Sequence, residues 1–296
     1  MLHKIALLGS PGTGKSTMGL SYPGVEQHCW GSSEDTTAAN FVGRTDILPA
    51  IRYDWYDTLT PEEQAKLSDE KVNELEIALL TKKARAKNVA RYRRYLYSLK
   101  AAKLSEARPE LQSILLDNFT PFSQEFEDYV EVVWGKEFLT KEGNFDTIAY
   151  YKRFASELSD FLRLFMSINC HTIITCHVAM LASEEVAANT SFMTAAKTGG
   201  IRKEWQPMIT GKARNILSAI PDWAFFLKVE ESPGLPTKYV AKLESDEANV
   251  GVAKPRIQPF ANPRRIEFPK NRFYEVFSEA LETYAKTGIA VKNPGA

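Results

Sequence analysis

The sequence predicts an α/β fold, and three apolar segments that lead into polar residues support this prediction. Residues 5–8 form an apolar run that precedes a glycine-rich loop and a helix beginning near Lys15. Residues 111–116 form a second run, which ends in Asp117, and the β-branched stretch at residues 171–177 forms a third. Such runs are typical of buried strands. Because helical periodicity separates the second run from the third, an alternating α/β protein is expected.

Length and composition bound the broad class of protein. The chain has 296 residues, 44% of them hydrophobic, which is ample for a sizeable core, and we expect one domain over residues 1–296. The net charge is zero, so any contact with nucleic acid or membrane has to come from a local patch. Three cysteines are too few for a disulfide framework or a zinc site. With no signal peptide and no membrane-length apolar run, we expect a cytoplasmic protein.

The most specific motif is the glycine-rich loop near the start of the chain. It has the form G-x-x-x-x-G-K-[ST] between a strand and a helix, the context expected of a phosphate-binding loop (P-loop). Glycines let the backbone N–H groups turn towards phosphate oxygens, a lysine supplies a full positive charge, and the following serine can ligate Mg²⁺. The expected nucleotide-binding residues are Gly9, Ser10, Pro11, Gly12, Thr13, Gly14, Lys15, Ser16 and Thr17.

Two carboxylate-bearing segments are candidates for the remaining chemistry. Asp117 ends an apolar strand about 100 residues after the P-loop, which is the Walker B arrangement, and it is expected to act with Ser16 at Mg²⁺. Asn118 follows it, so the glutamate that serves as catalytic base beside this aspartate in many ATPases is absent. We therefore expect the base just after the predicted strand at residues 25–30, with Glu34 favoured over Asp35. The alternative is a solvated acidic loop.

A histidine closes the third strand. His177 follows residues 171–176 and is expected to lie at the carboxyl edge of the sheet, where ligands gather. We expect it to sense the γ-phosphate and to relay its state to the following loop. The alternative is an ordinary histidine at the end of a strand.

Residues 60–108 differ in character from the rest of the chain. Acidic side chains dominate residues 62–76, and basic ones dominate residues 82–108, with Tyr92, Tyr95 and Tyr97 interleaved. We expect a long helix or helical hairpin inserted into the domain. One interpretation is a surface that follows a nucleic-acid backbone and stacks bases on the tyrosines. The other is a basic helix packed against an acidic one, with the tyrosines in the core.

Further elements complete the expected fold. Residues 122–134, 150–168, 211–220 and 273–286 are expected to be helical, and residues 223–229 and 238–243 are expected to form strands.

Taken together, these motifs resemble the RecA-like P-loop ATPases carried by bacteriophages, a group that includes small ATPases linked to single-strand annealing and recombination. The resemblance covers most of the chain except residues 60–108. It implies a mainly parallel sheet flanked by helices and Mg²⁺-dependent ATP hydrolysis between subunits of a homo-oligomer, either a ring or a filament. It also implies that Lys254 and Arg256 reach the neighbour's γ-phosphate, and that Lys197, Arg202 and Lys203 hold single-stranded DNA in recombination or replication. Pro255 and Asn118 are departures from the pattern.

Three other functions compete with a DNA-acting ATPase. A nucleotide-dependent assembly or packaging factor would use the inserted helices to grip protein partners. A small-molecule or nucleotide kinase would need an arginine-bearing lid, and the basic stretch is far longer than a lid. A GTPase ranks lowest, because no N-K-x-D-type segment and no D-x-x-G after Asp117 is present.

Overall fold

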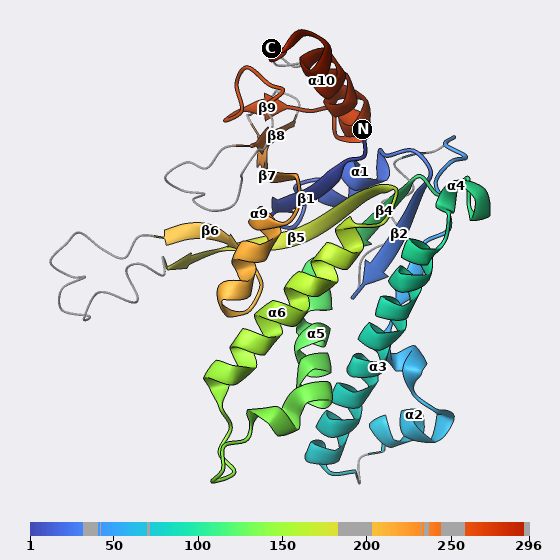
Figure 1. Cartoon of the computed structure of the whole chain (residues 1–296), viewed down its shortest axis with the longest axis vertical. Coiled ribbons are helices and arrows are strands. Elements are labelled where there is room, and N and C mark those ends of the chain that lie inside the picture. Colours follow the sequence, from blue (N-terminus) through green and yellow to red (C-terminus); the bar gives the residue numbers. More distant parts are fainter. Residues whose placement is uncertain are drawn as a thin grey trace, which may run out of the picture.

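The computed structural model describes residues 1–31, 41, 43–69, 72–182, 203–231, 233, 237–243 and 258–292. These residues form an α/β fold around one mixed, mostly parallel sheet of nine strands. Figure 1 shows the sheet with long helices extending from one face and α10 beyond the opposite face. The strands are β1 (Lys4–Gly9), β2 (Val25–Trp30), β3 (Ile51–Tyr53), β4 (Ser113–Asp117), β5 (His171–Ala182), β6 (Lys203–Pro207), β7 (Trp223–Glu230), β8 (Lys238–Lys242) and β9 (Ile266–Glu267).

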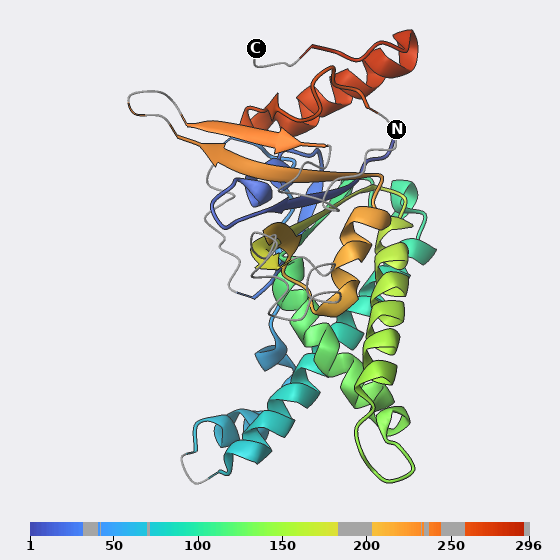
Figure 2. The same ribbon diagram turned by 90° about the vertical axis from the view of Figure 1, so that its left-hand side faces the viewer.

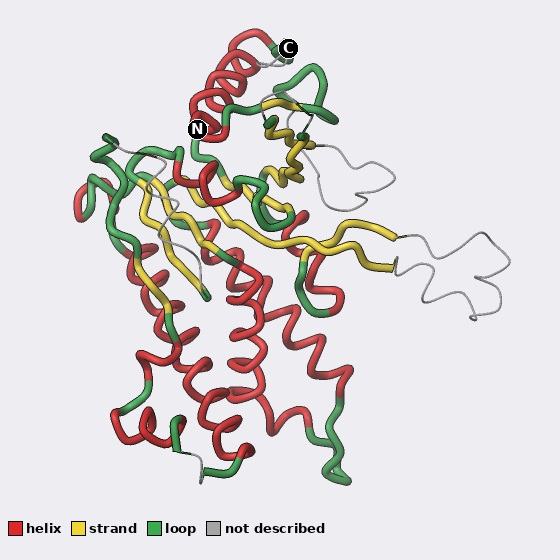
Figure 3. The backbone as a smooth tube through the Cα atoms, turned by 180° about the vertical axis from the view of Figure 1, so that it is seen from behind, coloured by secondary structure: helices red, strands yellow, loops and turns green. Residues whose placement is uncertain are grey.

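The strand order places β5 between the strand that enters the P-loop and the strand that ends in Asp117. Along the sheet the order is β3-β2-β4-β5-β1-β7-β8-β9. The six strands from β3 to β7 run parallel, so their carboxyl ends share one edge, whereas β8 and β9 are antiparallel additions. Beyond His177, β5 leaves the sheet and pairs with β6 as an antiparallel ribbon (Figure 3).

The helices cover the two faces of the sheet. One face packs against α3, α5, α6 and α9 through a large aromatic core that includes Tyr92, Phe122 and Phe161. The other face packs against α1 and α10. The helices are α1 (Lys15–Leu20), α2 (Pro61–Leu67), α3 (Glu74–Ala101), α4 (Leu104–Ala107), α5 (Phe119–Trp134), α6 (Thr147–Met166), α9 (Ile216–Ala219) and α10 (Phe273–Thr287), and the short 3-10 turns are Trp55–Thr58, Gly135–Phe138, Gly211–Asn215 and Lys270–Arg272.

Local sequence explains where the long helices begin. Thr60 accepts a hydrogen bond from the backbone of Glu63, whose side chain bonds back to Thr60, and Pro61 occupies the first position of α2. Asn73, Asn118 and Asp146 cap α3, α5 and α6 by accepting hydrogen bonds from backbone N–H groups. Each cap satisfies orphan donors at a helix start, which fixes the boundary.

The segment at residues 60–108 is built into the domain. Helix α3 has 28 residues and packs along α5, and its buried side chains join the main core. The expected helix over residues 211–220 is divided into a 3-10 turn and the short helix α9. The strands β3, β6 and β9 were not anticipated. Among the described residues, no helix is both long enough and apolar enough to cross a membrane.

Candidate functional site

The P-loop takes a backbone path that requires glycine. Gly12 and Gly14 have φ angles of 79° and 81°, in the left-handed region that favours glycine. At Gly9 the limit is steric, because a Cβ atom there would lie 2.6 Å from Thr13 Oγ1 and 2.9 Å from the carbonyl oxygen of Leu227. Thr13 in turn donates a hydrogen bond to the carbonyl oxygen of Ser10. The loop therefore closes tightly between β1 and α1.

Lys15 lies at the centre of this loop. Its side chain is buried, and Nζ donates hydrogen bonds to the carbonyl oxygens of Gly9 at 2.9 Å and Ser10 at 2.8 Å. Burial lowers the pKa of the ammonium group from 10.5 to about 8, although Asp117 and Cys176 oppose this shift. The loop therefore holds a desolvated amine bonded to backbone oxygens, which an anionic ligand can stabilise in its charged form.

Side-chain alternation puts the other polar residues on the same face of the sheet as α1. Ile5, Leu115 and Ile173 belong to the core between the sheet and this helix. Because strand side chains alternate with a period of two, Asp117 and Thr175 point to that face as well. The buried Asp117 carboxylate accepts a hydrogen bond from Thr175 Oγ1.

Gln27 fixes the second carboxylate oxygen of Asp117. Its Nε2 donates to Asp117 Oδ2 at 2.8 Å from the neighbouring strand β2. Asp117 is thereby held by one neighbour on each side of β4. The peptide bond between Asp117 and Asn118 is cis, and Asn118 caps α5, as its side-chain hydrogen bond to Thr120 N shows. The role of the Asn118 side chain is therefore to cap the N-terminus of α5.

His177 lies in register with Gly9, the residue that opens the P-loop. Burial lowers the pKa of its imidazole, as does the nearby Lys15, while Asp117 and the backbone of Gly9 oppose the shift. Among the described residues its Nδ1 is buried with no hydrogen-bond partner. The structure thus brings Lys15, Asp117 and His177 together at the carboxyl ends of three adjacent strands.

Few side chains of this site could hold a metal ion. In the described part of the chain, no group of three or more His, Cys, Asp or Glu side chains is placed to hold a metal. Mg²⁺ in nucleotide sites takes only one or two protein ligands and fills its shell with phosphate oxygens and water. The Ser16 hydroxyl and the Asp117 carboxylate are the oxygen donors that fit this pattern.

Several predicted site residues lie outside the described residues. Glu34 and Asp35 belong to this group, as do the predicted DNA contacts Lys197 and Arg202 and the predicted trans residues Lys254 and Arg256. Lys203 begins β6, but only its backbone is described.

Three cations of the basic helix α3 form ion pairs with acidic residues of the helices packed against it. Lys82 pairs with Glu131, Arg85 with Asp128 and Arg93 with Glu157, all on α5 or α6. Tyr92 is fully buried, and its hydroxyl hydrogen-bonds His28 Nδ1 at 2.9 Å. Tyr95 donates a hydrogen bond to Glu26, whereas Tyr97 is exposed. The second interpretation is confirmed for Tyr92, which lies in the core, but these acidic partners come from α5 and α6 and not from residues 62–76.

Two residues of the site were missed by the sequence analysis. Gln27 and Thr175 both hydrogen-bond Asp117, and neither belongs to a recognised motif. Register places both side chains on the face of the sheet that Asp117 also occupies, because Gln27 and Ile173 each pair with Leu115, two residues before Asp117.

Comparison of the chain with models of known protein families and with curated proteins finds no match. The class that the fold defines is an α/β protein with a mostly parallel sheet flanked by helices.

Proposed function

We propose that the protein binds ATP with Mg²⁺ at residues 9–17, hydrolyses the nucleotide, and acts on DNA as an oligomer of RecA-like subunits. The observation that carries this proposal is the convergence of Lys15, Asp117 and His177 at one edge and on one face of β1, β4 and β5. A glycine-rich loop with a stray lysine would not require a buried carboxylate and a half-buried imidazole beside it.

Each residue has a role that follows from its position. Lys15 moves from the loop carbonyls to the β- and γ-phosphates, where its charge offsets the charge of the transferring group. Ser16 ligates Mg²⁺, and Asp117, held by Thr175 and Gln27, orients the water around the ion. Mg²⁺, when bound, would neutralise the charge that develops on the β- and γ-phosphates.

His177 serves as the γ-phosphate sensor in this proposal. Its Nδ1 has no protein partner among the described residues, and its peptide N–H donates to Thr120 Oγ1 at 3.1 Å. A terminal phosphate oxygen can take a hydrogen bond from the ring. The catalytic base is proposed to be Glu34, with Asp35 as the alternative.

The DNA and oligomer parts rest on the resemblance to RecA-like ATPases. Lys197, Arg202 and Lys203 are proposed to contact single-stranded DNA, and Lys254 and Arg256 are proposed to complete the neighbouring subunit's site. Mixing the Lys15→Ala and Arg256→Ala proteins tests the second part. Each variant keeps the half-site that the other has lost, so mixtures are expected to regain activity. An active monomer in light scattering would contradict an intersubunit site.

The central experiment measures ATP turnover alone and with single-stranded DNA, double-stranded DNA or RNA. Single-stranded DNA is expected to stimulate turnover, and Lys15→Ala is expected to reduce turnover at least a hundredfold. Lys66→Ala is the matched control, because Lys66 is an exposed lysine of α2 paired only with Glu76 among the described residues. Near-normal turnover in Lys15→Ala would remove the ATPase proposal.

A second candidate function, the assembly factor, is favoured by one observation. Large apolar side chains are exposed where α3, α5 and α6 end far from the sheet (Figure 2). They are Leu75, Leu79, Val132, Val133, Leu139, Phe145, Ile148 and Tyr151. Leu75 and Leu79 lie near the start of α3, whereas the other six belong to the end of α5, the start of α6 and the connection between them. Exposed apolar groups close together in such a connection are typical of protein contacts. An ATP turnover rate that no nucleic acid changes would favour this candidate over a DNA-acting ATPase.

A further inference from the structure

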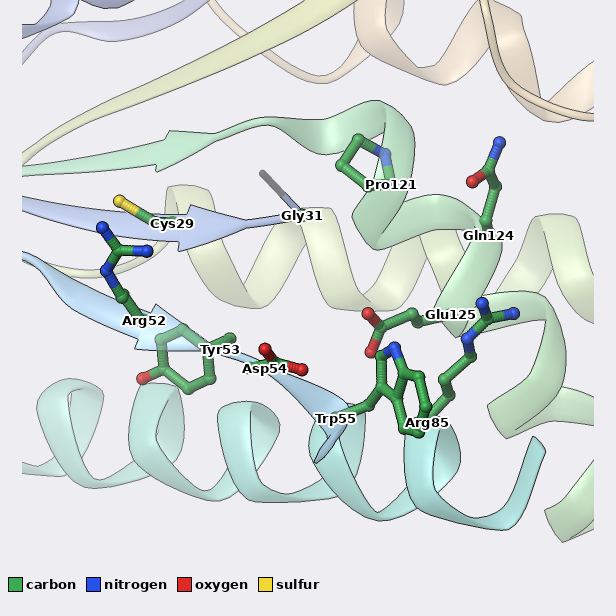
Figure 4. A pocket seen from close by; sticks show the side chains of 10 residues that line it. All are labelled: Cys29, Gly31, Arg52, Tyr53, Asp54, Trp55, Arg85, Pro121, Gln124 and Glu125. Carbon is green, nitrogen blue, oxygen red and sulfur yellow. The ribbon is translucent and has the colours of Figure 1, made fainter. Parts of the chain in front are cut away.

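A cavity opens at the same edge of the sheet as the P-loop. Its volume is about 270 Å³, and it lies between the carboxyl ends of β2 and β3, the helix α3 and the first turns of α5 (Figure 4). The lining residues that matter here are Tyr53, Asp54, Trp55, Arg85, Gln124 and Glu125. None of them belongs to the P-loop site described above.

The cavity is separate from the place where phosphates would bind. The strands β4 and β5 stand between β2 and β1, so the two places are three strand spacings apart. At about 4.8 Å per spacing this is roughly 14 Å. The cavity is therefore distinct from the P-loop itself, although Asp117 lies on β4, the strand next to β2.

Contacts behind the lining fix the walls. Trp30 stacks on Tyr53 with ring centroids 5.2 Å apart and an interplanar angle of 4°. Asn88 Nδ2 donates to the carbonyl oxygen of Tyr53 at 3.1 Å and to Glu125 Oε2 at 3.0 Å. The Arg85 guanidinium lies 5.7 Å from the centroid of the Trp55 ring. The aromatic and polar walls are thus formed before any ligand arrives.

Glu125 has a carboxylate oxygen that can accept a further hydrogen bond. It is 7% exposed, and within the described part of the chain Asn88 is its one hydrogen-bonding partner, at Oε2. The other oxygen is available to a ligand in the cavity, towards which the carboxylate points in Figure 4. Burial raises the pKa of Glu125 to about 7, with Asp54 and Asp128 adding to the shift and Asn88 and Arg85 opposing it.

These features select a ligand by charge and shape. Arg52 and Arg85 offset the charges of Asp54 and Glu125 in the lining, so the cavity favours neither an anion nor a cation, while Gln124 offers both an amide donor and an acceptor. Trp55 supplies flat aromatic surface, and Tyr53, which Trp30 stacks against, supports the wall. A neutral, planar heterocycle with an amino group satisfies all of these groups. We propose that this cavity binds an amino-bearing nucleobase (adenine, cytosine or guanine), which Trp55 contacts through its ring and Glu125 recognises by accepting a hydrogen bond from the amino group.

The base has two possible sources, a free nucleoside or a single-stranded nucleic acid that lies along this edge. The second source rests on the proposed DNA function, and the first does not. Binding is measured by calorimetry on the full chain with its P-loop occupied by a non-hydrolysable ATP analogue and Mg²⁺. The probes are deoxyadenosine, deoxycytidine and thymidine, and the matching 12-residue homopolymers. Repeating the titrations in Lys15→Ala without the analogue separates base binding from ATP binding.

Probes with an amino group are expected to bind at least tenfold more tightly than thymidine probes, whose base has no exocyclic amine. Trp55→Ala is expected to weaken binding about tenfold, the effect of losing one stacked base. Trp134→Ala is the matched control, because Trp134 is a half-buried tryptophan stacked by Arg153 outside the cavity. Equal binding of thymidine and adenine probes, or unchanged affinity in Trp55→Ala, would overturn the proposal.

Glu125→Gln gives an independent readout that survives if Trp55→Ala fails to fold. In the wild-type protein, affinity is expected to fall as the pH drops from 8 to 6. Asn88 donates to Oε2, so the proton is taken up by Oε1, and an O–H group there faces the donating amino group of the base. Glutamine keeps an acceptor oxygen but does not titrate, so the variant is expected to bind with no change over this range. A wild-type affinity that is constant from pH 8 to 6 would contradict the role of Glu125.

Discussion

Replacing Lys15 by methionine is expected to stabilise the protein in the absence of nucleotide. Methionine has a similar length and no charge, so it fills the same buried space without a desolvated ammonium group. The pKa of Lys15 is about 8 in the folded protein against an ordinary value of 10.5. The folded state therefore disfavours the charged form.

The magnitude follows from these two pKa values. Their difference of about 2.5 corresponds to ~3 kcal/mol of unfavourable free energy at neutral pH, at about 1.4 kcal/mol for each pKa unit. The substitution also removes the hydrogen bonds to Gly9 and Ser10, each worth about 1 kcal/mol. We expect Lys15→Met to raise the free energy of unfolding by about 1 kcal/mol at pH 7.

The sign of the pH dependence provides the sharper test. Between pH 8 and 10.5 the unfolded chain still holds the lysine proton that the folded protein has released, so wild-type stability gains relative to the variant as pH rises. Urea unfolding of both proteins at pH 7 and pH 10 measures this difference. Titratable groups that the two proteins share contribute equally to both unfolding free energies, so they drop out of the comparison. The variant is expected to be more stable at pH 7 and less stable at pH 10. A difference that stays the same at both pH values would refute the reasoning.

Three further predictions concern the site and the core. Asp117→Asn keeps an acceptor for Thr175, and a rotated Gln27 amide can offer its oxygen to the new amide group, so the unfolding free energy is expected to change by less than about 1 kcal/mol. Mg²⁺-dependent ATP turnover is expected to fall at least a hundredfold, and equal turnover would contradict the role of Asp117. Burial opposes ionisation of Glu26, but hydrogen bonds from His28 and Arg108 hold its pKa at about 2, so Glu26→Gln is expected to cost about 2–3 kcal/mol at pH 7. The wild-type advantage should disappear as the pH falls from 4.5 to 2, which acid titration of both proteins by circular dichroism would reveal. Phe122→Ala removes a fully buried ring of the main core and is expected to cost about 3–5 kcal/mol in urea unfolding, with a smaller loss counting against tight packing there.

Strands with strong patterns could be predicted closely from the sequence. The predicted strand at residues 25–30 coincides with β2, and the run that ends in Asp117 ends β4 as expected. In β4 the apolar residues are consecutive, as a strand buried on both faces requires, whereas β2 is buried although it carries Glu26, Gln27 and His28. The expected α/β fold with a mainly parallel sheet flanked by helices is confirmed at that level of description. The RecA-like assignment stays a prediction.

Other elements left no readable local pattern. The strand β3 has three residues, and β9 has two, which is too short for any periodicity. The ion-pair partners of α3 were also unpredictable from local sequence. Glu131, Asp128 and Glu157 lie 49, 43 and 64 residues after the basic residues that they pair with. The cavity at the ends of β2 and β3 is lined by residues of β3, α3 and α5, which are far apart in the sequence. Only the tertiary structure could therefore reveal Glu125 as a candidate binding residue.

The 12-residue strand β5 has a mechanical consequence. It pairs with β1 as far as His177 and with β6 from Val178 to Ala182, with no intervening loop. Its last five residues, at about 3.3 Å each, extend β5 roughly 16 Å beyond His177, where β6 is its one pairing neighbour among the described residues. A tilt of β5 near Thr175 would therefore displace the far end of the ribbon by more than it displaces the site.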